Sequence, residues 1–148
     1  MEMVLKELVS HPLQLQETEV VEINAKKIGA LQSDEHLDIL TKIRSEVCSA
    51  KEGYSYVQVD LIPASGNFQL GIIMRGKFVS ENAISKEQFE RFLLVQGVKI
   101  LWSYVREVVY DITGRMLRSA FLLPTLDVVQ TLMNAKKEDE DIKENGKD

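Results

Sequence analysis

One long helical stretch, Ser85–Leu117, constrains the fold of this chain more than any other part of the sequence. It contains no proline, and its apolar side chains recur with the period of an α-helix. Ser85 and Gln88 stand at the spacing at which two side chains satisfy each other's free amides at a helix start. Gly97 lies inside the stretch. Because glycine destabilises a helix by about 1 kcal/mol relative to alanine, we expect a kink or break there.

The apolar surface of this stretch widens after Gly97. Trp102, Val109 and Tyr110 lie outside the main stripe, and the polar residues keep only a narrow strip. One sheet covers one apolar stripe, so a helix this apolar needs a second partner. The sequence therefore predicts an oligomer, with Trp102, Val109 and Tyr110 at the interface between subunits.

The stretches before the helix have the residue pattern of β-strands. Residues 37–47, 54–62 and 67–78 alternate apolar and polar side chains and are joined by short turns, which predicts an antiparallel meander. Residues 13–23 are also β-friendly, but Glu17 and Glu19 interrupt the alternation, which predicts a bent, bulged or edge strand. The predicted fold is therefore α+β: a four-stranded antiparallel sheet covered on one face by a long kinked helix and a short C-terminal helix.

The chain after the long helix divides into a short extended run, a last helix and a charged tail. Pro124 keeps the residue before it extended, and Thr125 or Asp127 can cap the last helix. Residues 136–148 are charged, with Ile142 as their one apolar residue. We therefore expect a single domain over residues 1–135 and a disordered tail over residues 136–148.

Composition excludes several classes of protein. A formal net charge of −5 and a pI near 5.2 argue against a nucleic-acid surface. Cys48 is the single cysteine, so no internal disulfide can form and a reducing compartment fits. The first ten residues are charged and have no long apolar core, unlike a signal peptide or a membrane anchor. We expect a cytoplasmic protein that does not insert into membranes.

No motif in the sequence specifies a catalytic reaction. The glycines form no phosphate-binding loop, and the two histidines have no cysteine partner at metal-ligand spacing. Cys48 has only His36 as a candidate base. The pattern of Glu17, Glu19 and Glu22 favours a solvent-exposed face over a catalytic acid–base pair. We therefore predict no enzyme, no cofactor and no metal, and keep an enzyme using the glutamate face as a minor hypothesis.

Four short segments carry a resemblance to a known family. The run Ile100–Glu107, with its tyrosine, arginine and glutamate, resembles a segment of the SecB-type export chaperones. Arg75–Phe78 upstream, Phe121–Pro124 downstream and Leu13–Gln16 at the start are similar to family segments in the same order. The resemblance spans most of residues 13–134. It implies a homotetramer, a dimer of dimers, that holds unfolded preproteins in apolar grooves and passes them to the SecA motor.

The resemblance also implies site residues, with some departures. The acid expected in motor docking is present at Glu22, but Lys26 and Gly71 stand where two further acids are expected. Residues 29–35 form a shorter loop than the family's and lack its aromatic groove residues. On this resemblance the client-binding groove is expected to include the following residues: Tyr54, Tyr56, Phe121, Leu122, Leu123 and Leu126.

Two functions from different classes remain open at this point. The first is a non-enzymatic SecB-like chaperone that binds unfolded or partner polypeptide as a homodimer or homotetramer, with weak or absent docking to a SecA-type motor. The alternative is an oligomeric structural or regulatory adaptor with a SecB-like fold and no export role. The sequence names neither the client nor a toxin–antitoxin partner.

Overall fold

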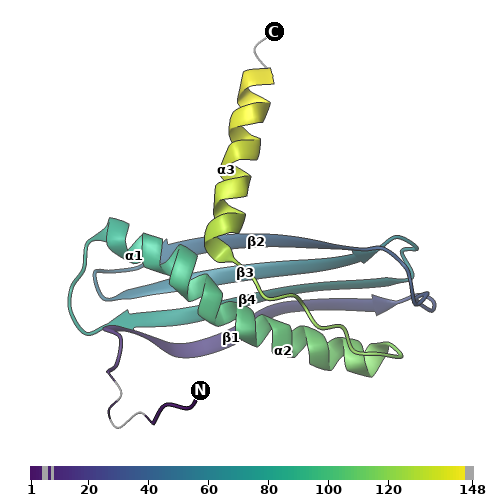
Figure 1. Cartoon of the computed structure of the whole chain (residues 1–148), viewed down its shortest axis with the longest axis horizontal. Coiled ribbons are helices and arrows are strands. Elements are labelled where there is room, and N and C mark those ends of the chain that lie inside the picture. Colours follow the sequence, from purple (N-terminus) through teal and green to yellow (C-terminus); the bar gives the residue numbers. More distant parts are fainter. Residues whose placement is uncertain (5–6, 8, 146–148) are drawn as a thin grey trace.

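The predicted strands form one antiparallel sheet (Figure 1). The computed structural model describes residues 1–4, 7 and 9–145. The strands are β1 (Leu13–Lys27), β2 (Leu37–Val47), β3 (Glu52–Pro63) and β4 (Phe68–Ser80). Their order in the sheet is β1-β4-β3-β2, and each neighbouring pair is antiparallel. The predicted meander is confirmed, and β1 joins it beside β4 at one edge.

The helices lie on one face of this sheet, as the α+β prediction requires (Figure 1). The long helical stretch is built from α1 (Lys86–Phe92), a π-helical turn η1 (Leu93–Gly97) and α2 (Val98–Met116). Ser85 caps α1, its side chain accepting a hydrogen bond from the Gln88 amide at 3.2 Å. A last helix, α3 (Val128–Asn145), follows after an irregular segment.

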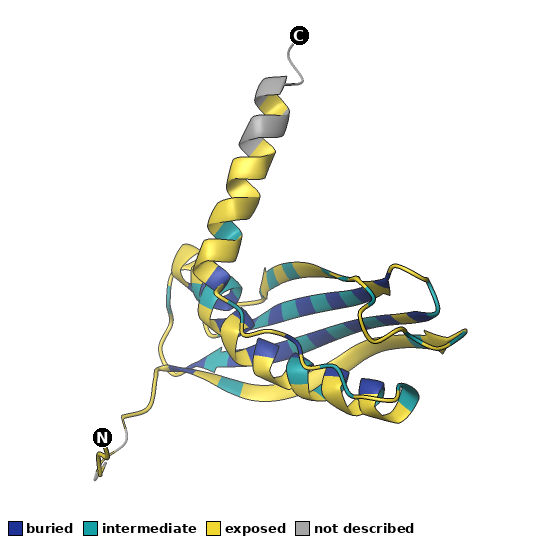
Figure 2. Cartoon of the chain, turned by 45° about the vertical axis from the view of Figure 1, so that its right-hand side comes forward, coloured by how far each residue is buried: buried dark blue, intermediate teal, exposed yellow. Residues whose placement is uncertain are grey.

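The core lies between the sheet and the helical layer, and burial alternates along the two central strands (Figure 2). Val57, Val59 and Leu61 of β3 are buried, as predicted, and the side chains between them are half-exposed on the opposite face. We call that opposite face the outer face of the sheet. The buried residues of β4 and α2 that complete the main core are Phe68, Leu70, Ile72, Met74, Val98, Leu101, Trp102, Val105 and Val109.

The edge strand β1 contains two irregularities, which explain its broken alternation. Its pairing with β4 shifts between Leu15 and Glu17 and again between Val20 and Glu22. Each shift adds one residue to β1 and turns the following side chains to the other face. Glu19 consequently pairs with Arg75 on the outer face, and Ile23 returns to the inner phase opposite Ile72. The predicted bulged edge strand is confirmed.

The predicted break in the long helix is a π-turn that ends at Gly97 and rests on β3. In this turn the Val98 amide bonds back to the Leu93 carbonyl. The same carbonyl accepts a 2.7 Å hydrogen bond from the hydroxyl of Ser55, which is fully buried. A Cβ at position 97 would overlap the Ser55 hydroxyl, so glycine permits the close approach of helix and strand.

The irregular segment between α2 and α3, residues 117–127, runs back along α2, and we call it the return segment. Three side chains of α2 bond its main chain. Thr113 Oγ1 accepts from the Phe121 amide at 2.8 Å, Arg106 Nε donates to the Leu123 carbonyl at 2.9 Å, and Trp102 Nε1 donates to the Pro124 carbonyl at 2.9 Å. The side chain of Leu123 in this segment is fully buried in the core.

The last helix extends away from the sheet beyond its first turns (Figure 1). Val128 is buried and Leu132 packs against the core. Where the sequence predicts a disordered tail, residues 136–145 continue α3 instead, and residues 146–148 lie outside the described part of the chain. Lysine and glutamate have good helix propensities, so a segment with Ile142 as its one apolar residue can still extend a helix already begun.

Candidate functional site

The six residues expected to form one client groove lie on two sides of the sheet. Tyr54 and Tyr56 belong to the outer face of β3, whereas Phe121, Leu123 and Leu126 pack against the core on the helical side. Leu122 is exposed on the return segment. The expected single groove is therefore corrected: the alternation of β3 places its tyrosines across the sheet from the return segment.

The two tyrosines belong to a network of paired polar side chains on the outer face. The Arg44 guanidinium lies over the Tyr56 ring, 3.8 Å from its centroid, and that of Arg75 lies 5.1 Å from the Tyr54 centroid. Arg75 also donates to Glu19 through Nε at 2.8 Å, and this hydrogen bond is the main cause of the raised pKa of Arg75. This part of the outer face satisfies its own charges and leaves few of them for a partner.

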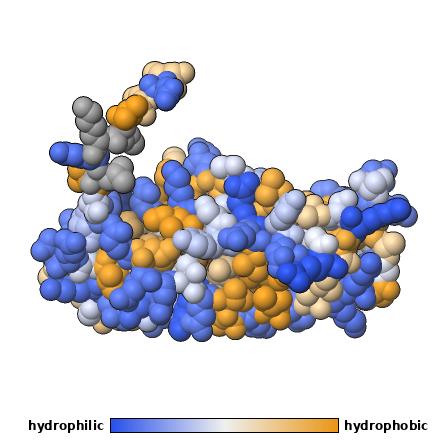
Figure 3. Space-filling model, turned by 90° about the horizontal axis from the view of Figure 1, so that it is seen from below, coloured by the Kyte–Doolittle hydropathy of each residue, from blue (hydrophilic) through white to orange (hydrophobic). Residues whose placement is uncertain are grey.

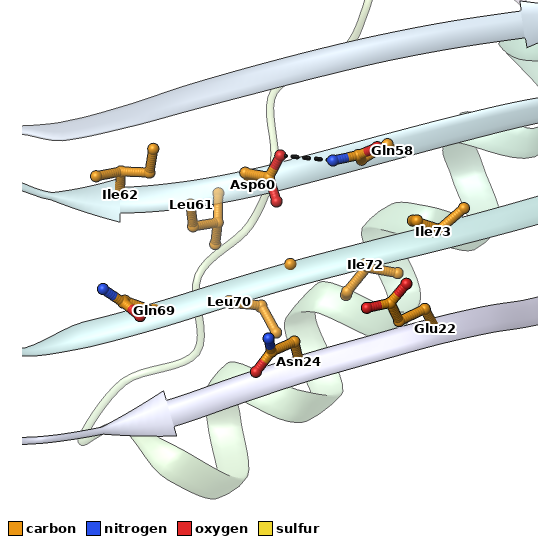
Figure 4. A pocket seen from close by; sticks show the side chains of 11 residues that line it. Glu22, Asn24, Gln58, Asp60, Leu61, Ile62, Gln69, Leu70, Ile72 and Ile73 are labelled. Carbon is orange, nitrogen blue, oxygen red and sulfur yellow. Dashed lines mark hydrogen bonds between the residues drawn. The ribbon is translucent and has the colours of Figure 1, made fainter.

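The other part of the outer face is hollow and acidic (Figure 4). We call it the outer-face hollow, about 340 Å³ in volume. Asn24 from β1 and Asp60 from β3 flank β4 at Gly71, whose missing side chain opens the space. Glu22 lines the same hollow two residues before Asn24, opposite Ile73. A Cβ on Gly71 would lie 2.8 Å from Asp60 Oδ1. Asp60 also accepts from Gln58 Nε2 at 3.0 Å.

Asp60 supplies an acidic side chain near the position where the resemblance to SecB-type chaperones led us to expect an acid at Gly71. Gly71 stands where an acid is expected, but Gly71 pairs with Asp60 on the neighbouring strand, so the carboxylate reaches the same place from β3. The polar phase of β3 in the sequence already places Asp60 on this face. Lys26 pairs with Gln69 and is exposed at the end of β1.

The helical layer leaves several large apolar side chains uncovered. Ile100 and Tyr104 are one turn apart on the exposed side of α2, 39% and 40% exposed. Further along the layer, Leu122, Val129 and Met133 are each more than half exposed. Exposed apolar side chains in one layer mark a surface suited to binding another polypeptide.

Two of the three expected interface residues lie inside the chain. Trp102 is 4% exposed and Val109 is fully buried, because the return segment covers this side of α2. The extra apolar width of α2 therefore receives its second partner from the same chain, which corrects the expectation for these two residues. Tyr110, 53% exposed, is the one of the three that lies at the surface of the chain.

A groove runs between the first helical turns of the long stretch and the start of α3. We call it the α1–α3 groove, with a volume of about 580 Å³. Its lining residues are Gln88, Arg91, Phe92, Val95, Gln96, Val129, Leu132, Met133 and Lys136. The ring of His11 stacks on Phe92 at a centroid distance of 5.4 Å, so the N-terminal segment arrives beside this groove.

The free outer edge of β1 is a further candidate surface. β1 is the last strand in the sheet order, and its residues Val20, Val21 and Ile23 are exposed. Figure 3 views the molecule from below the orientation of Figure 1, where β1 is the lowest strand of the sheet. Apolar side chains gather over the middle of this view. An edge of this length presents unpaired main-chain groups to another strand.

The candidate catalytic residues are not brought together. His36 bonds Asp38 at 2.8 Å and precedes β2, whereas Cys48 follows the other end of that strand. Partial desolvation raises the pKa of Cys48, which disfavours a thiolate nucleophile. Within the described ranges, no three or more His, Cys, Asp or Glu side chains are grouped to hold a metal. No helix among the described residues is both long and apolar enough to cross a membrane.

Comparison with known proteins adds a structural relative. No family model and no curated protein sequence matches this chain. A solved structure of the Mycobacterium tuberculosis Rv1957 SecB-like chaperone, in complex with a ChAD peptide from the Rv1956 HigA1 antitoxin, superposes with a TM-score of 0.66. The match covers 78% of this chain and 88% of that chain at 17% identity.

A second solved structure is a protein of unknown function from Streptococcus agalactiae. It matches with a TM-score of 0.47 and 10% identity, over 78% of this chain and 99% of that one, and this likeness is too weak to support an argument. The match to the mycobacterial chaperone agrees with the strand order, the helix cover and the resemblance of the short segments. The fold of this chain is SecB-like.

Proposed function

We propose that this protein is a non-enzymatic, cytoplasmic SecB-like chaperone or polypeptide-binding protein that holds unfolded segments of other chains. The observation that carries the proposal is the uncovered apolar surface of the helical layer, where Ile100, Tyr104, Leu122, Val129 and Met133 are each between 39% and 59% exposed. The SecB-like chaperone of similar fold was solved with a peptide bound, which supports a polypeptide as the ligand class.

The chemistry of such binding needs no reactive group. An unfolded segment buries its apolar side chains on this surface, and each square ångström buried stabilises the complex by about 25 cal/mol. Apolar contact is not directional, so segments of different sequence can bind. Ordering the segment offsets part of the gain, and single sites of this kind therefore hold clients weakly.

We further propose that the protein is a homodimer or homotetramer. The free edge of β1 with its exposed Val20, Val21 and Ile23, together with Tyr110 on α2, supports an interface between copies. Several weak client sites in one assembly bind a long unfolded chain more tightly than one site does, because later contacts are intramolecular.

The adaptor remains the second candidate, because Ile100, Tyr104 and Tyr110 on α2 can equally serve self-assembly alone. The two functions differ in what the assembled protein leaves uncovered. A chaperone keeps apolar surface for clients, and an adaptor buries it between its own subunits.

The deciding experiment measures aggregation and size on one sample. A reduced, unfolding-prone protein is diluted from denaturant with and without stoichiometric amounts of this protein, and light scattering is followed. We expect scattering to be suppressed and the protein to sediment as a dimer or tetramer. Sedimentation as an oligomer without any suppression contradicts the chaperone and favours the adaptor; sedimentation as a monomer contradicts the assembly.

A variant with less apolar surface identifies the site in the same assay. Leu122→Ser removes an exposed side chain of the return segment without touching the core, so the fold should be retained. We expect weaker suppression from this variant than from Thr125→Ala, a matched exposed control on the same segment. Equal suppression by both would move the client site away from the return segment.

A further inference from the structure

The α1–α3 groove has a charge opposite to that of the whole molecule. The chain has a formal net charge of −5, yet the lining of this groove includes Arg91 and Lys136 and no carboxylate. The outer-face hollow is the reverse, with Glu22 and Asp60 in its lining and no cation. The two concave surfaces therefore differ in the charge of the ligand that they would accept.

The floor of the groove is apolar and its rim is polar. Phe92 and Val95 come from the helical stretch, and Val129 and Met133, each about half exposed, come from α3. The side-chain amides of Gln88 and Gln96 add groups that can donate to or accept from a main chain. Arg91 forms no ion pair with any residue that the structure describes, so its charge is available to a ligand.

We propose that the α1–α3 groove binds a segment of a partner protein in which apolar and acidic side chains are interspersed. The apolar side chains pack on Phe92, Val95 and Met133, and the carboxylates meet Arg91 and Lys136 at the rim. This inference rests on the proposed polypeptide-binding function and names the site and the ligand chemistry. It makes the protein selective for acidic apolar segments, although its own net charge is negative.

The test uses three labelled peptides with one apolar pattern. Their polar positions carry glutamate, glutamine or lysine, and binding to the full chain is followed by fluorescence anisotropy at low and high salt. Rim ion pairs are partly screened, so two of them together should make the glutamate peptide bind roughly tenfold more tightly than the lysine peptide. The preference should shrink as salt is raised.

Charge reversal in the groove should reverse the preference. Arg91→Glu combined with Lys136→Glu is expected to make the lysine peptide the tightest ligand, and both positions are exposed, so the fold should be retained. Lys99→Glu is the control, because Lys99 is exposed on α2 and does not line the groove. Met133→Ser should weaken all three peptides to a similar extent by removing apolar floor.

Three outcomes would overturn the inference. Equal affinity for the three peptides, or a glutamate preference unchanged in the Arg91 and Lys136 double variant, removes the role of these cations. A chain lacking residues 1–10 that binds the glutamate peptide much more tightly shows that the chain's own N-terminal segment occupies the groove instead. Aggregation suppression by the wild-type protein in the same preparations separates these failures from a failure of the proposed function.

Discussion

The two sides of the sheet differ in what their polar groups bind. On the outer face, side chains pair with one another across strands, as Arg75 does with Glu19 and Lys77 with Glu52 at 3.2 Å. On the helical side, the polar side chains of α2 bond main-chain atoms of the return segment instead. The outer face is thus largely satisfied by its own residues, whereas the helical side is built to hold an extended chain.

This difference shows how α2 holds an extended segment of its own chain. The hydrogen bonds that Trp102, Arg106 and Thr113 form with the return segment go to two carbonyls and one amide of its main chain. Such groups are present in every residue, except that proline lacks the amide hydrogen. The apolar side chains of the segment then fill the space above the core. The contacts between α2 and the return segment thus combine main-chain hydrogen bonds with apolar packing, the combination by which proteins recognise extended segments.

The largest expected effect tests whether Trp102 belongs to the chain's own core. Trp102→Ala should reduce the free energy of unfolding by about 3–5 kcal/mol, because it removes a buried aromatic ring and its bond to Pro124. Urea unfolding monitored by circular dichroism measures the change. Unchanged stability with loss of the oligomer would place Trp102 at an interface between subunits after all.

The next effect tests the contact between helix and sheet at Gly97. Gly97→Ala introduces a methyl group that overlaps the Ser55 hydroxyl and disturbs its bond to Leu93, so we expect a loss of about 2 kcal/mol. Gly114→Ala is the matched control, because its methyl group would meet Ala120 at 3.4 Å. We expect the control to be neutral or slightly stabilising, and equal losses in both would contradict the argument.

Docking of a SecA-type motor tests the outer face. Glu22 and Asp60 are present in the hollow, but Lys26 is exposed at the end of β1, where a cation repels a basic partner. We expect weak or absent binding by titration calorimetry, and Lys26→Glu should strengthen it. Submicromolar binding by the wild-type protein that is lost in Glu22→Lys would contradict this prediction.

A smaller effect depends on pH and concerns the far end of the sheet. Glu35 accepts from the Ser65 hydroxyl at 2.8 Å and from its amide, and the hydroxyl bond is the main cause of the lowered pKa of Glu35. A carboxyl with a lowered pKa in the folded state stabilises the fold above its unfolded value, near 4.5, and loses this contribution as pH falls through the folded value.

Glu35→Gln should therefore lower the melting temperature slightly at neutral pH and leave it unchanged in acid. Thermal unfolding at pH 7 and below pH 4 compares the two, with Gln32→Ala as a loop control. A difference between wild type and variant that grows in acid would contradict the sign.

The smallest expected effect concerns the end of α3. A chain that ends at Ala135 should unfold at nearly the same temperature as the full chain, because the removed residues include Ile142 as their one apolar residue and residues 136–145 extend away from the body (Figure 1). A large drop in melting temperature would show that this part of α3 packs against something, such as a second copy.

The sequence predicts the sheet well because its strands have one buried face, and the alternation of β2, β3 and β4 reports that face directly. It predicts the helix break from Gly97 but not the π-turn, which depends on the Ser55 bond across 38 residues of chain. The sequence also does not reveal what covers Trp102. An apolar residue at this position fits the same helical pattern whether its own chain or another subunit buries it.

The candidate site is predicted only in part for the same reason. The resemblance places Tyr54 and Phe121 in one groove, although the alternation of β3 already puts Tyr54 on the same face as Asp60. The spacing of Phe121 does not state which layer it belongs to. The α1–α3 groove joins Arg91 to Lys136, residues from two helices whose packing is not encoded in either helix alone. Short-range periodicity reports burial, and contacts between distant elements need the assembled structure.

The paired irregularities of β1 bear on which strands can add to the sheet. Two extra residues within one edge strand increase its local twist, and a straight strand from an unrelated chain cannot follow that twist over its full length. A second copy of β1 carries the same irregularities and can match them. The edge is therefore better suited to pairing with a second copy of β1 than to indiscriminate stacking with strands of other chains.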